Sequence, residues 1–99
     1  MGLRVPFDSE NAEYIRSGIR SRIEQSSVTL VAVSETTYKS KWVNWEIRES
    51  LKMGKGVVVV NISNDPSIRM PDAVNENRNK IKIVSWKHLE IMNAIDTSA

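Results

Sequence analysis

Two short, almost uninterrupted apolar segments most constrain the fold of this chain. They are Val28–Val33, with the sequence Val-Thr-Leu-Val-Ala-Val, and residues 57–62, with the sequence Val-Val-Val-Val-Asn-Ile. Such runs are typical of strands that are buried on both faces, as strands of a parallel sheet are. A third apolar segment, residues 81–84, predicts a third strand, and the polar segment 64–80 predicts irregular structure with a short helical turn.

Helical patterns separate these segments. Apolar residues at helical spacing predict one helix over residues 9–25 and another over residues 41–53, which Gly54 would end. Ser85 is placed to cap a last helix. Strands that alternate with helices imply right-handed crossovers and a parallel sheet. We therefore predict an α/β fold with helices on both faces of the sheet, in a single domain spanning residues 1–99.

The composition excludes several classes of partner. The formal net charge is +2, from 14 basic and 12 acidic residues, which is too balanced to favour nucleic-acid binding. The chain has no cysteine, as suits a reducing compartment. No run approaches the roughly 18 apolar residues of a membrane span, and no signal-peptide apolar region is present. We expect a cytoplasmic protein that binds neither nucleic acid nor membranes.

Residues 40–51 contain the strongest candidate for a functional side chain. Ser40 is a good N-cap, and apolar residues recurring around Ile47 predict a buried stripe. Glu46 falls on the rim of that stripe, with Trp42 one turn earlier on the same side. A carboxyl group at such a boundary is partly desolvated, which raises its pKa and makes it a candidate for chemistry. The alternative is that Glu46 is a solvated helix acid and Trp42 fills the core. The predicted stripe consists of Val43, Ile47, Ser50 and Leu51.

The loop of residues 34–39 leads from the first predicted strand into this helix. In parallel α/β sheets, ligands bind beyond the carboxyl ends of the strands, where this loop lies. We therefore predict a pocket in which loop hydroxyls and an indole bind a ligand beside the candidate acid Glu46. The predicted binding residues are Ser34, Thr36, Thr37 and Trp42. The alternative for the three hydroxyls is ordinary loop and capping polarity.

Other familiar sites are missing from the sequence. No glycine-rich phosphate loop of the GxGxxG or GxxxxGK[ST] type occurs. His88 is the only histidine, and without cysteine a closed zinc site would need several carboxylates. We expect no metal site.

Three segments together resemble a known family. They are Ser-Ser-Val-Thr-Leu-Val at residues 26–31, Ser-Lys-Trp-Val-Asn-Trp-Glu-Ile at residues 40–47, and Gly-Lys-Gly-Val at residues 54–57. Their combination resembles the TIR-like domains of bacterial signalling proteins, including those of the Thoeris antiphage defence system. The resemblance covers roughly residues 8–62 well and the remainder loosely. The segment 40–47 is its most specific part and is similar to the Trp-Val-x-x-Glu-Ile stretch of TIR domains that consume NAD.

The resemblance implies a flavodoxin-like fold and an activity. TIR enzymes cleave the bond between nicotinamide and ribose in NAD, and the Thoeris type makes ADP-ribose-derived signals. The glutamate of this helix is catalytic in such enzymes, which implies that Glu46 is the catalytic acid and that Trp42 walls the pocket. NAD would be the substrate, and no cofactor is implied.

Domains of this family normally begin with a further strand and crossover helix, a unit of roughly 30 residues. We expect this chain to lack that unit, so that it is an N-terminally shortened form. The edge of Val28–Val33 would then be unpaired unless residues 3–7 close beside it, and an open apolar edge is a template for pairing with another chain. Enzyme activity is therefore left undecided. The main alternative is a non-catalytic TIR-like interaction module, an adaptor or decoy, that assembles with other TIR proteins or with itself. A further alternative is a flavodoxin-like domain that binds a small nucleotide without turnover.

Overall fold

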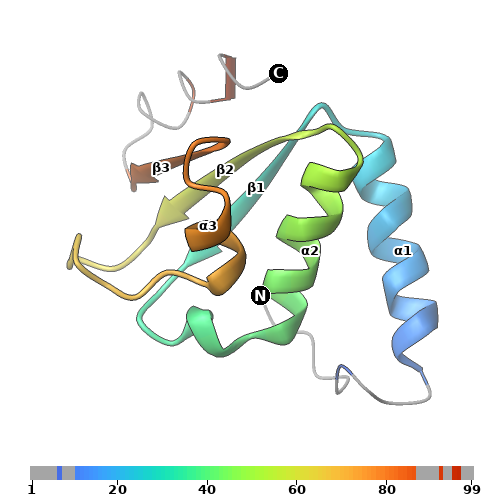
Figure 1. Cartoon of the computed structure of the whole chain (residues 1–99), viewed down its shortest axis with the longest axis horizontal. Coiled ribbons are helices and arrows are strands. Elements are labelled where there is room, and N and C mark those ends of the chain that lie inside the picture. The colour runs from blue at the N-terminus through green and yellow to red at the C-terminus, as the bar shows by residue number, and fades with distance from the viewer. Residues whose placement is uncertain (1–6, 8–10, 87–91, 93–94, 97–99) are drawn as a thin grey trace.

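The computed structural model describes residues 7, 11–86, 92, 95 and 96 of the 99-residue chain. One parallel sheet with the strand order β1-β2-β3 forms its centre (Figure 1). The strands are β1 (Val28–Val33), β2 (Gly56–Asn61) and β3 (Ile81–Ser85). The helices are α1 (Ala12–Glu24), α2 (Lys41–Lys52) and α3 (Asp72–Glu76), with a single 3-10 turn, η1 (Thr37–Lys39), before α2. The α/β fold with a parallel sheet is therefore confirmed.

Most predicted bounds hold to within a few residues. Strand β1 has its predicted bounds, and α1 and α2 lie inside the predicted helices. Strand β2 lies one residue earlier than predicted, because the N–H of Gly56 already donates to the Ser27 carbonyl oxygen at 3.1 Å. The segment of residues 3–7, whose pairing with β1 was left open, lies outside the described residues apart from Phe7. So does most of the last helix, of which Met92, Ile95 and Asp96 are described.

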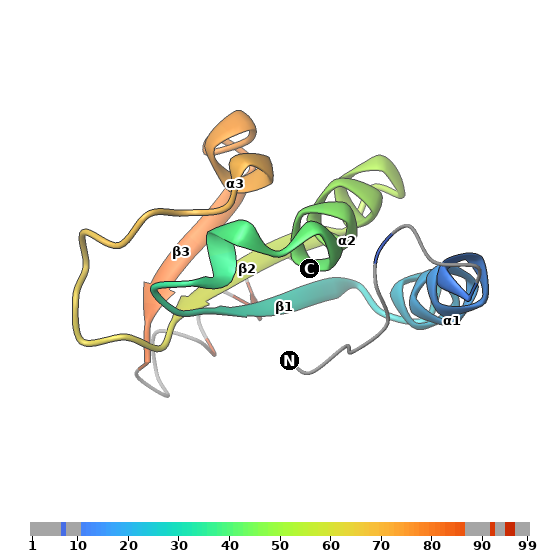
Figure 2. The same cartoon turned by 90° about the horizontal axis from the view of Figure 1, so that it is seen from below.

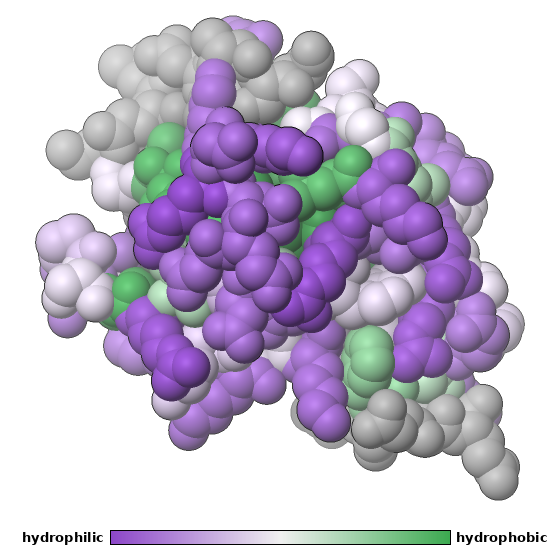
Figure 3. All heavy atoms as spheres, in the orientation of Figure 1, coloured by the Kyte–Doolittle hydropathy of each residue, from purple (hydrophilic) through white to green (hydrophobic). Residues whose placement is uncertain are grey.

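Helices α2 and α3 cover one face of the sheet (Figure 2). The main core lies between these two helices and the strands, and the side chains over the helices present a mostly hydrophilic surface (Figure 3). On the opposite face, Val58 and Val60 are buried, and Val28, Val84 and Ile95 pack against them. Strand β2 is therefore buried on both faces, as predicted. The main core consists of Val31, Val33, Val43, Ile47, Val57, Val59, Met70, Ala73, Val74 and Ile81.

The prediction that β1 is also buried on both faces is wrong. Val31 and Val33 are buried, but Leu30 is 49% exposed and Ala32 is exposed. The reason is position, because β1 lies at the edge of the sheet and, among the described residues, pairs with β2 alone. Alternate residues of a parallel strand bond to one neighbour, and the carbonyl groups of Ser27 and Val33 bond toward β2. The backbone N–H and C=O groups of Val28, Leu30 and Ala32 therefore point away from β2, toward the edge of the sheet.

Helix α1 lies on the side of β1 away from β2 (Figures 1 and 2). It packs on α2 through a second apolar cluster, made by Ala12, Ile19 and Ile23 with Trp42. An ion pair between the α1 residue Arg20 and the α2 residue Glu49, 3.1 Å from Nε to Oε1, adds to this contact. The docking of α1 determines the surroundings of the predicted site.

Candidate functional site

The predicted start and buried stripe of α2 are confirmed. The Ser40 hydroxyl accepts a hydrogen bond from the N–H of Val43 at 3.2 Å, so it caps the helix. Val43, Ile47 and Ser50 are buried, and Leu51 packs against the same core. Because this stripe faces the sheet, it fixes the rotation of α2 and turns the adjacent side of the helix toward α1.

Two hydroxyl groups, of the buried Ser50 and the half-buried Thr29, join α2 to β1 next to the backbone of the candidate acid. The Ser50 hydroxyl donates to the Glu46 carbonyl oxygen at 2.8 Å and lies 2.8 Å from the Thr29 hydroxyl. A serine hydroxyl has one proton, so the Thr29 hydroxyl must be the donor toward Ser50. These two bonds hold the backbone of Glu46 at a fixed position relative to β1.

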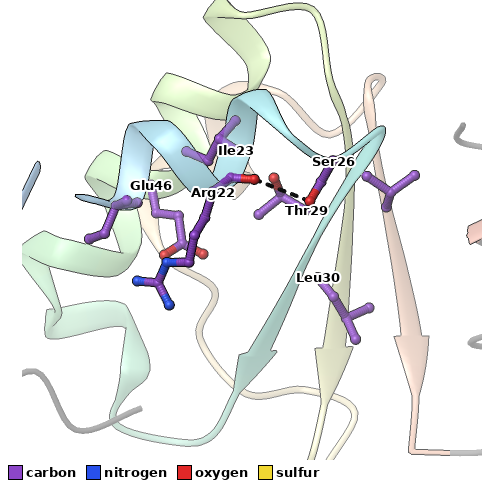
Figure 4. A pocket seen from close by; sticks show the side chains of 8 residues that line it. Arg22, Ile23, Ser26, Thr29, Leu30 and Glu46 are labelled. Atoms are coloured by element: carbon purple, nitrogen blue, oxygen red, sulfur yellow. Dashed lines mark hydrogen bonds between the residues drawn. The ribbon is translucent and has the colours of Figure 1, made fainter. Parts of the chain in front are cut away.

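The Glu46 side chain lies at a hollow of about 280 Å³ between α1, α2 and the start of β1 (Figure 4). Two turns of α1 form one wall, and the first residues of β1 form another. The carboxyl group is half-buried in a mostly apolar setting, as expected for the rim of the stripe. The other lining residues are Ile19, Arg22, Ile23, Ser26, Val28, Thr29 and Leu30.

The hollow alters the acidity of Glu46. Burial raises the pKa of the Glu46 carboxyl above its ordinary value, and the positive charge of Arg22 opposes that change in part. Figure 4 shows the Arg22 side chain beside the Glu46 carboxylate. A carboxyl group with a raised pKa exchanges its proton closer to neutral pH than an exposed glutamate does. The desolvation that the sequence predicted for Glu46 is therefore present, and its catalytic role stays a prediction.

Trp42 lies behind the wall of this hollow. It is buried and makes edge-on contacts with Phe7 and Trp45, at centroid distances of 5.0 and 6.2 Å. It also packs in the same cluster as Ile19 and Ile23, which line the hollow on their other side. Trp42 supports the wall beside Glu46 without being one of the lining residues.

The loop hydroxyls lie elsewhere. The Thr37 hydroxyl accepts a hydrogen bond from the Ser34 N–H at 2.8 Å and lies 3.1 Å from the Ser34 hydroxyl. Thr36 is exposed just before η1. The Glu46 hollow extends along β1 as far as Leu30, four residues before Ser34, which corresponds to about 13 Å along a parallel strand. The structure thus brings Ser34 and Thr37 together but does not gather them with Glu46 in this hollow.

Sequence reasoning missed the contribution of α1 to the site. Arg22 and Thr29 both line the hollow, and neither was a predicted site residue. The available signal was weak: Arg22 follows Ile19 by three positions, so helical spacing puts it next to the apolar side of α1. Within the described residues, no group of three or more acidic, histidine or cysteine side chains is arranged to hold a metal ion.

The parallel sheet flanked by helices, with Trp42 and Glu46 one turn apart on α2, is consistent with the flavodoxin-like fold of a TIR-like domain. A family model described as "Thoeris protein ThsB, TIR-like domain" matches residues 3–67, which is more than half of the chain. The chain therefore belongs to this family, and the resemblance stated from its sequence is confirmed. No curated protein matches the chain. In the part of the chain that the structure describes, no helix has the length and apolar character needed to cross a membrane.

Proposed function

We propose that this TIR-like domain cleaves NAD to make an ADP-ribose-derived signal in antiphage defence, with Glu46 as the catalytic residue. The observation that carries the proposal is the half-buried Glu46 carboxyl, whose pKa is raised by burial in a hollow of its own. The chain belongs to a TIR-like family, and the resemblance of residues 40–47 to TIR domains that consume NAD supports the reaction class. Carboxyl groups in such settings are frequent participants in catalysis.

In the proposed step the bond between the ribose C1′ atom and the nicotinamide nitrogen breaks. Its electron pair leaves with the nicotinamide ring, which becomes neutral, while positive charge develops on the ribose. The Glu46 carboxylate would stabilise that charge. Water or a hydroxyl group of the ligand then adds to C1′, and its proton passes to Glu46 or to solvent. The apolar wall of Ile19 and Ile23, supported by Trp42, would limit the access of water.

The size of the hollow limits what it can hold. At about 280 Å³ it is slightly smaller than the roughly 300–1,000 Å³ typical of small-molecule sites. It therefore suits the nicotinamide-ribose end of NAD, with the rest of the dinucleotide extending along the surface. This fit concerns one end of the substrate only.

The test is nicotinamide release from NAD, followed by chromatography. The wild-type domain should release nicotinamide, and Glu46→Gln should lower the rate about 100-fold or more, since it removes the charge while keeping the shape. Glu24→Gln is the matched control, because Glu24 is an exposed acid of α1 that does not line the hollow. If folded wild-type protein releases no nicotinamide, the proposed enzyme activity is refuted. If Glu46→Gln and Glu24→Gln release it at equal rates, Glu46 has no part in the mechanism.

A second candidate function is a non-catalytic interaction module that assembles with itself or with other TIR proteins. The edge of β1, which pairs with no other strand than β2 among the described residues, favours it, because this strand carries no charge and exposes Leu30 and Ala32. Natural sheets normally protect such edges with charged residues or proline. Self-association should appear in light scattering as a mass that rises with concentration, and Leu30→Lys should suppress it. A monomer at every concentration would exclude self-association.

A further inference from the structure

Phe7 lies outside the helices and strands but contacts both helices that form the Glu46 hollow. Its ring meets the Trp42 indole edge-on, with 5.0 Å between the ring centroids. On α1, the guanidinium carbon of Arg16 lies 4.3 Å from the centroid of the same ring. Phe7 therefore joins α2 to α1 from a position nine residues before Arg16 along the chain.

Arg16 holds Phe7 by two different interactions. Its Nη2 atom donates a hydrogen bond to the Phe7 carbonyl oxygen at 2.8 Å, while its guanidinium carbon lies over the ring. The Arg16 side chain is only 19% exposed, and its Nη1 atom lies 3.5 Å from the Glu13 carboxylate. A guanidinium that is mostly removed from water is costly unless its donors and its charge find partners. The contacts with Phe7 provide both, and they fix the backbone and the ring of Phe7 together.

Trp42 connects this contact to the hollow. Its indole packs with Ile19 and Ile23, and these two side chains line the hollow of Glu46. Phe7 packs against the same cluster and also lines a separate hollow of about 320 Å³, so it forms the outer layer of the wall. Loss of the Phe7 ring would uncover part of the indole and let it move away from the isoleucines.

We propose that Phe7 is a positioning residue for the candidate catalytic site. Held by Arg16, it keeps Trp42 against the isoleucines and so keeps the apolar wall beside Glu46 closed to water. Its influence on catalysis rests on the proposed function, whereas its influence on the hydration of Glu46 does not. Phe7 does not belong to the main core, so this role is separable from folding.

The ionisation of Glu46 reports whether the wall is closed. Burial raises the pKa of the Glu46 carboxyl, and Arg22, which faces it from α1, opposes that rise. The lining residues of β1 are uncharged, and Glu49, the next acid on α2, is paired with Arg20. Water that enters through a loosened wall would therefore lower the pKa of Glu46 without any change in the charged groups that face it.

The test is NMR titration of the side-chain carboxyl carbons, with the Glu46 signal assigned by its loss in Glu46→Gln. Phe7→Ala should lower the midpoint of that signal toward the ordinary pKa of 4.5. Tyr14→Ala is the matched control, because Tyr14 is an aromatic residue of α1 that is 82% exposed and does not line the hollow. It should leave the midpoint unchanged.

Arg16→Gln separates the positioning effect from an effect of charge. Loss of a positive charge alone would raise the pKa of a carboxyl, whereas loss of the hold on Phe7 should lower the Glu46 midpoint. In the double variant Phe7→Ala/Arg16→Gln the midpoint should fall no further than in Phe7→Ala, because both changes break the same contact. If Phe7→Ala does not fold, Phe7→Leu provides the same test, since it keeps an apolar side chain but removes the ring.

Three results would overturn the proposal. They are an unchanged or raised midpoint in folded Phe7→Ala or Phe7→Leu, an equal fall in Tyr14→Ala, and a raised midpoint in Arg16→Gln. Nicotinamide release gives a second readout, in which Phe7→Ala should lower the rate about tenfold or more while Tyr14→Ala keeps it. Equal rates in an active protein would overturn the influence on catalysis. If wild type releases no nicotinamide, the proposed function fails and the titration still decides the role of Phe7.

Discussion

The hydrogen bond between Thr29 and Ser50 offers a direct test of how β1 holds the helix that carries Glu46. Ser50 is fully buried, and its hydroxyl accepts from Thr29 while donating to the Glu46 carbonyl oxygen. Ser50→Ala removes the acceptor and leaves the Thr29 hydroxyl proton without that partner. Thr29→Val removes the donor but keeps the shape of the side chain.

The expected magnitudes follow from this arrangement. A buried polar group that loses its partner costs about 1–3 kcal/mol, and the better helix propensity of alanine returns up to about 0.5 kcal/mol in Ser50→Ala. Each single variant should therefore lose about 1–2 kcal/mol of unfolding free energy. The double variant leaves neither hydroxyl, so it should lose less than the sum of the two, with a coupling of about 0.5–3 kcal/mol. A domain of this size has roughly 5–15 kcal/mol in total, so all three proteins should fold.

Urea unfolding followed by tryptophan fluorescence measures all four proteins of this cycle. The slope of the transition should stay constant, so that midpoint changes report stability alone. Additive losses, within about 0.3–0.5 kcal/mol, would show that the two hydroxyl groups do not depend on each other. Such a result would refute the assignment of Thr29 as the donor to Ser50.

Three further predictions concern stability. Ile47→Ala should lower the free energy of unfolding in urea by about 2–5 kcal/mol, because Ile47 is fully buried. Lys52→Ala, at an exposed position, should change it by less than about 0.5 kcal/mol. A similar small effect of both would contradict the placement of Ile47 in the core. The pKa of Glu46 is raised in the folded state, so wild type should lose stability relative to Glu46→Gln as the pH rises above the ordinary pKa of 4.5. At lower pH the stabilities of the two proteins should converge. Urea midpoints that keep a constant difference across this pH range would contradict the burial of the carboxyl. Gly54→Ala should destabilise the fold by about 1 kcal/mol and lower the melting temperature. The cause is the backbone φ of +74°, since an added Cβ would meet open space and no clash. An unchanged melting temperature would argue against that backbone conformation.

The bounds of the helices and strands were predictable because they depend on residues that are close together in the sequence. Four consecutive valines in β2 and the Ser40 cap of α2 produced bounds close to those observed. The exposure of Leu30 was not predictable in the same way, because β1 and β2 have similar sequences but different places in the sheet. Strand order and the neighbours of an edge are tertiary properties, which hydrophobic patterns do not encode.

In the candidate site, too, some features follow from local sequence patterns and others depend on tertiary packing. The partial burial of Glu46 followed from the rotation of one helix, which periodicity determines. The role of Arg22 depends on how α1 docks, because periodicity marks the apolar side of α1 but not the element against which that side packs. The hydroxyl groups of Ser34 and Thr37 bond to each other, so their polarity meets the needs of a turn. This is the outcome that the alternative interpretation of those residues described, and it leaves a ligand role for them untested.

The spacing of Trp42 and Glu46 has a structural explanation in the docking of α1. One turn apart on α2, both face α1, and Trp42 packs with the same isoleucines, Ile19 and Ile23, that line the hollow of Glu46. The indole thus anchors the helix that desolvates the carboxyl. Glu49, almost one turn further, is held by Arg20 at 3.1 Å and so fastens α1 through an ion pair. Two acids on one side of α2 therefore have different roles: Glu49 pairs with α1, whereas Glu46 opens onto the hollow that α1 creates and has its pKa raised there.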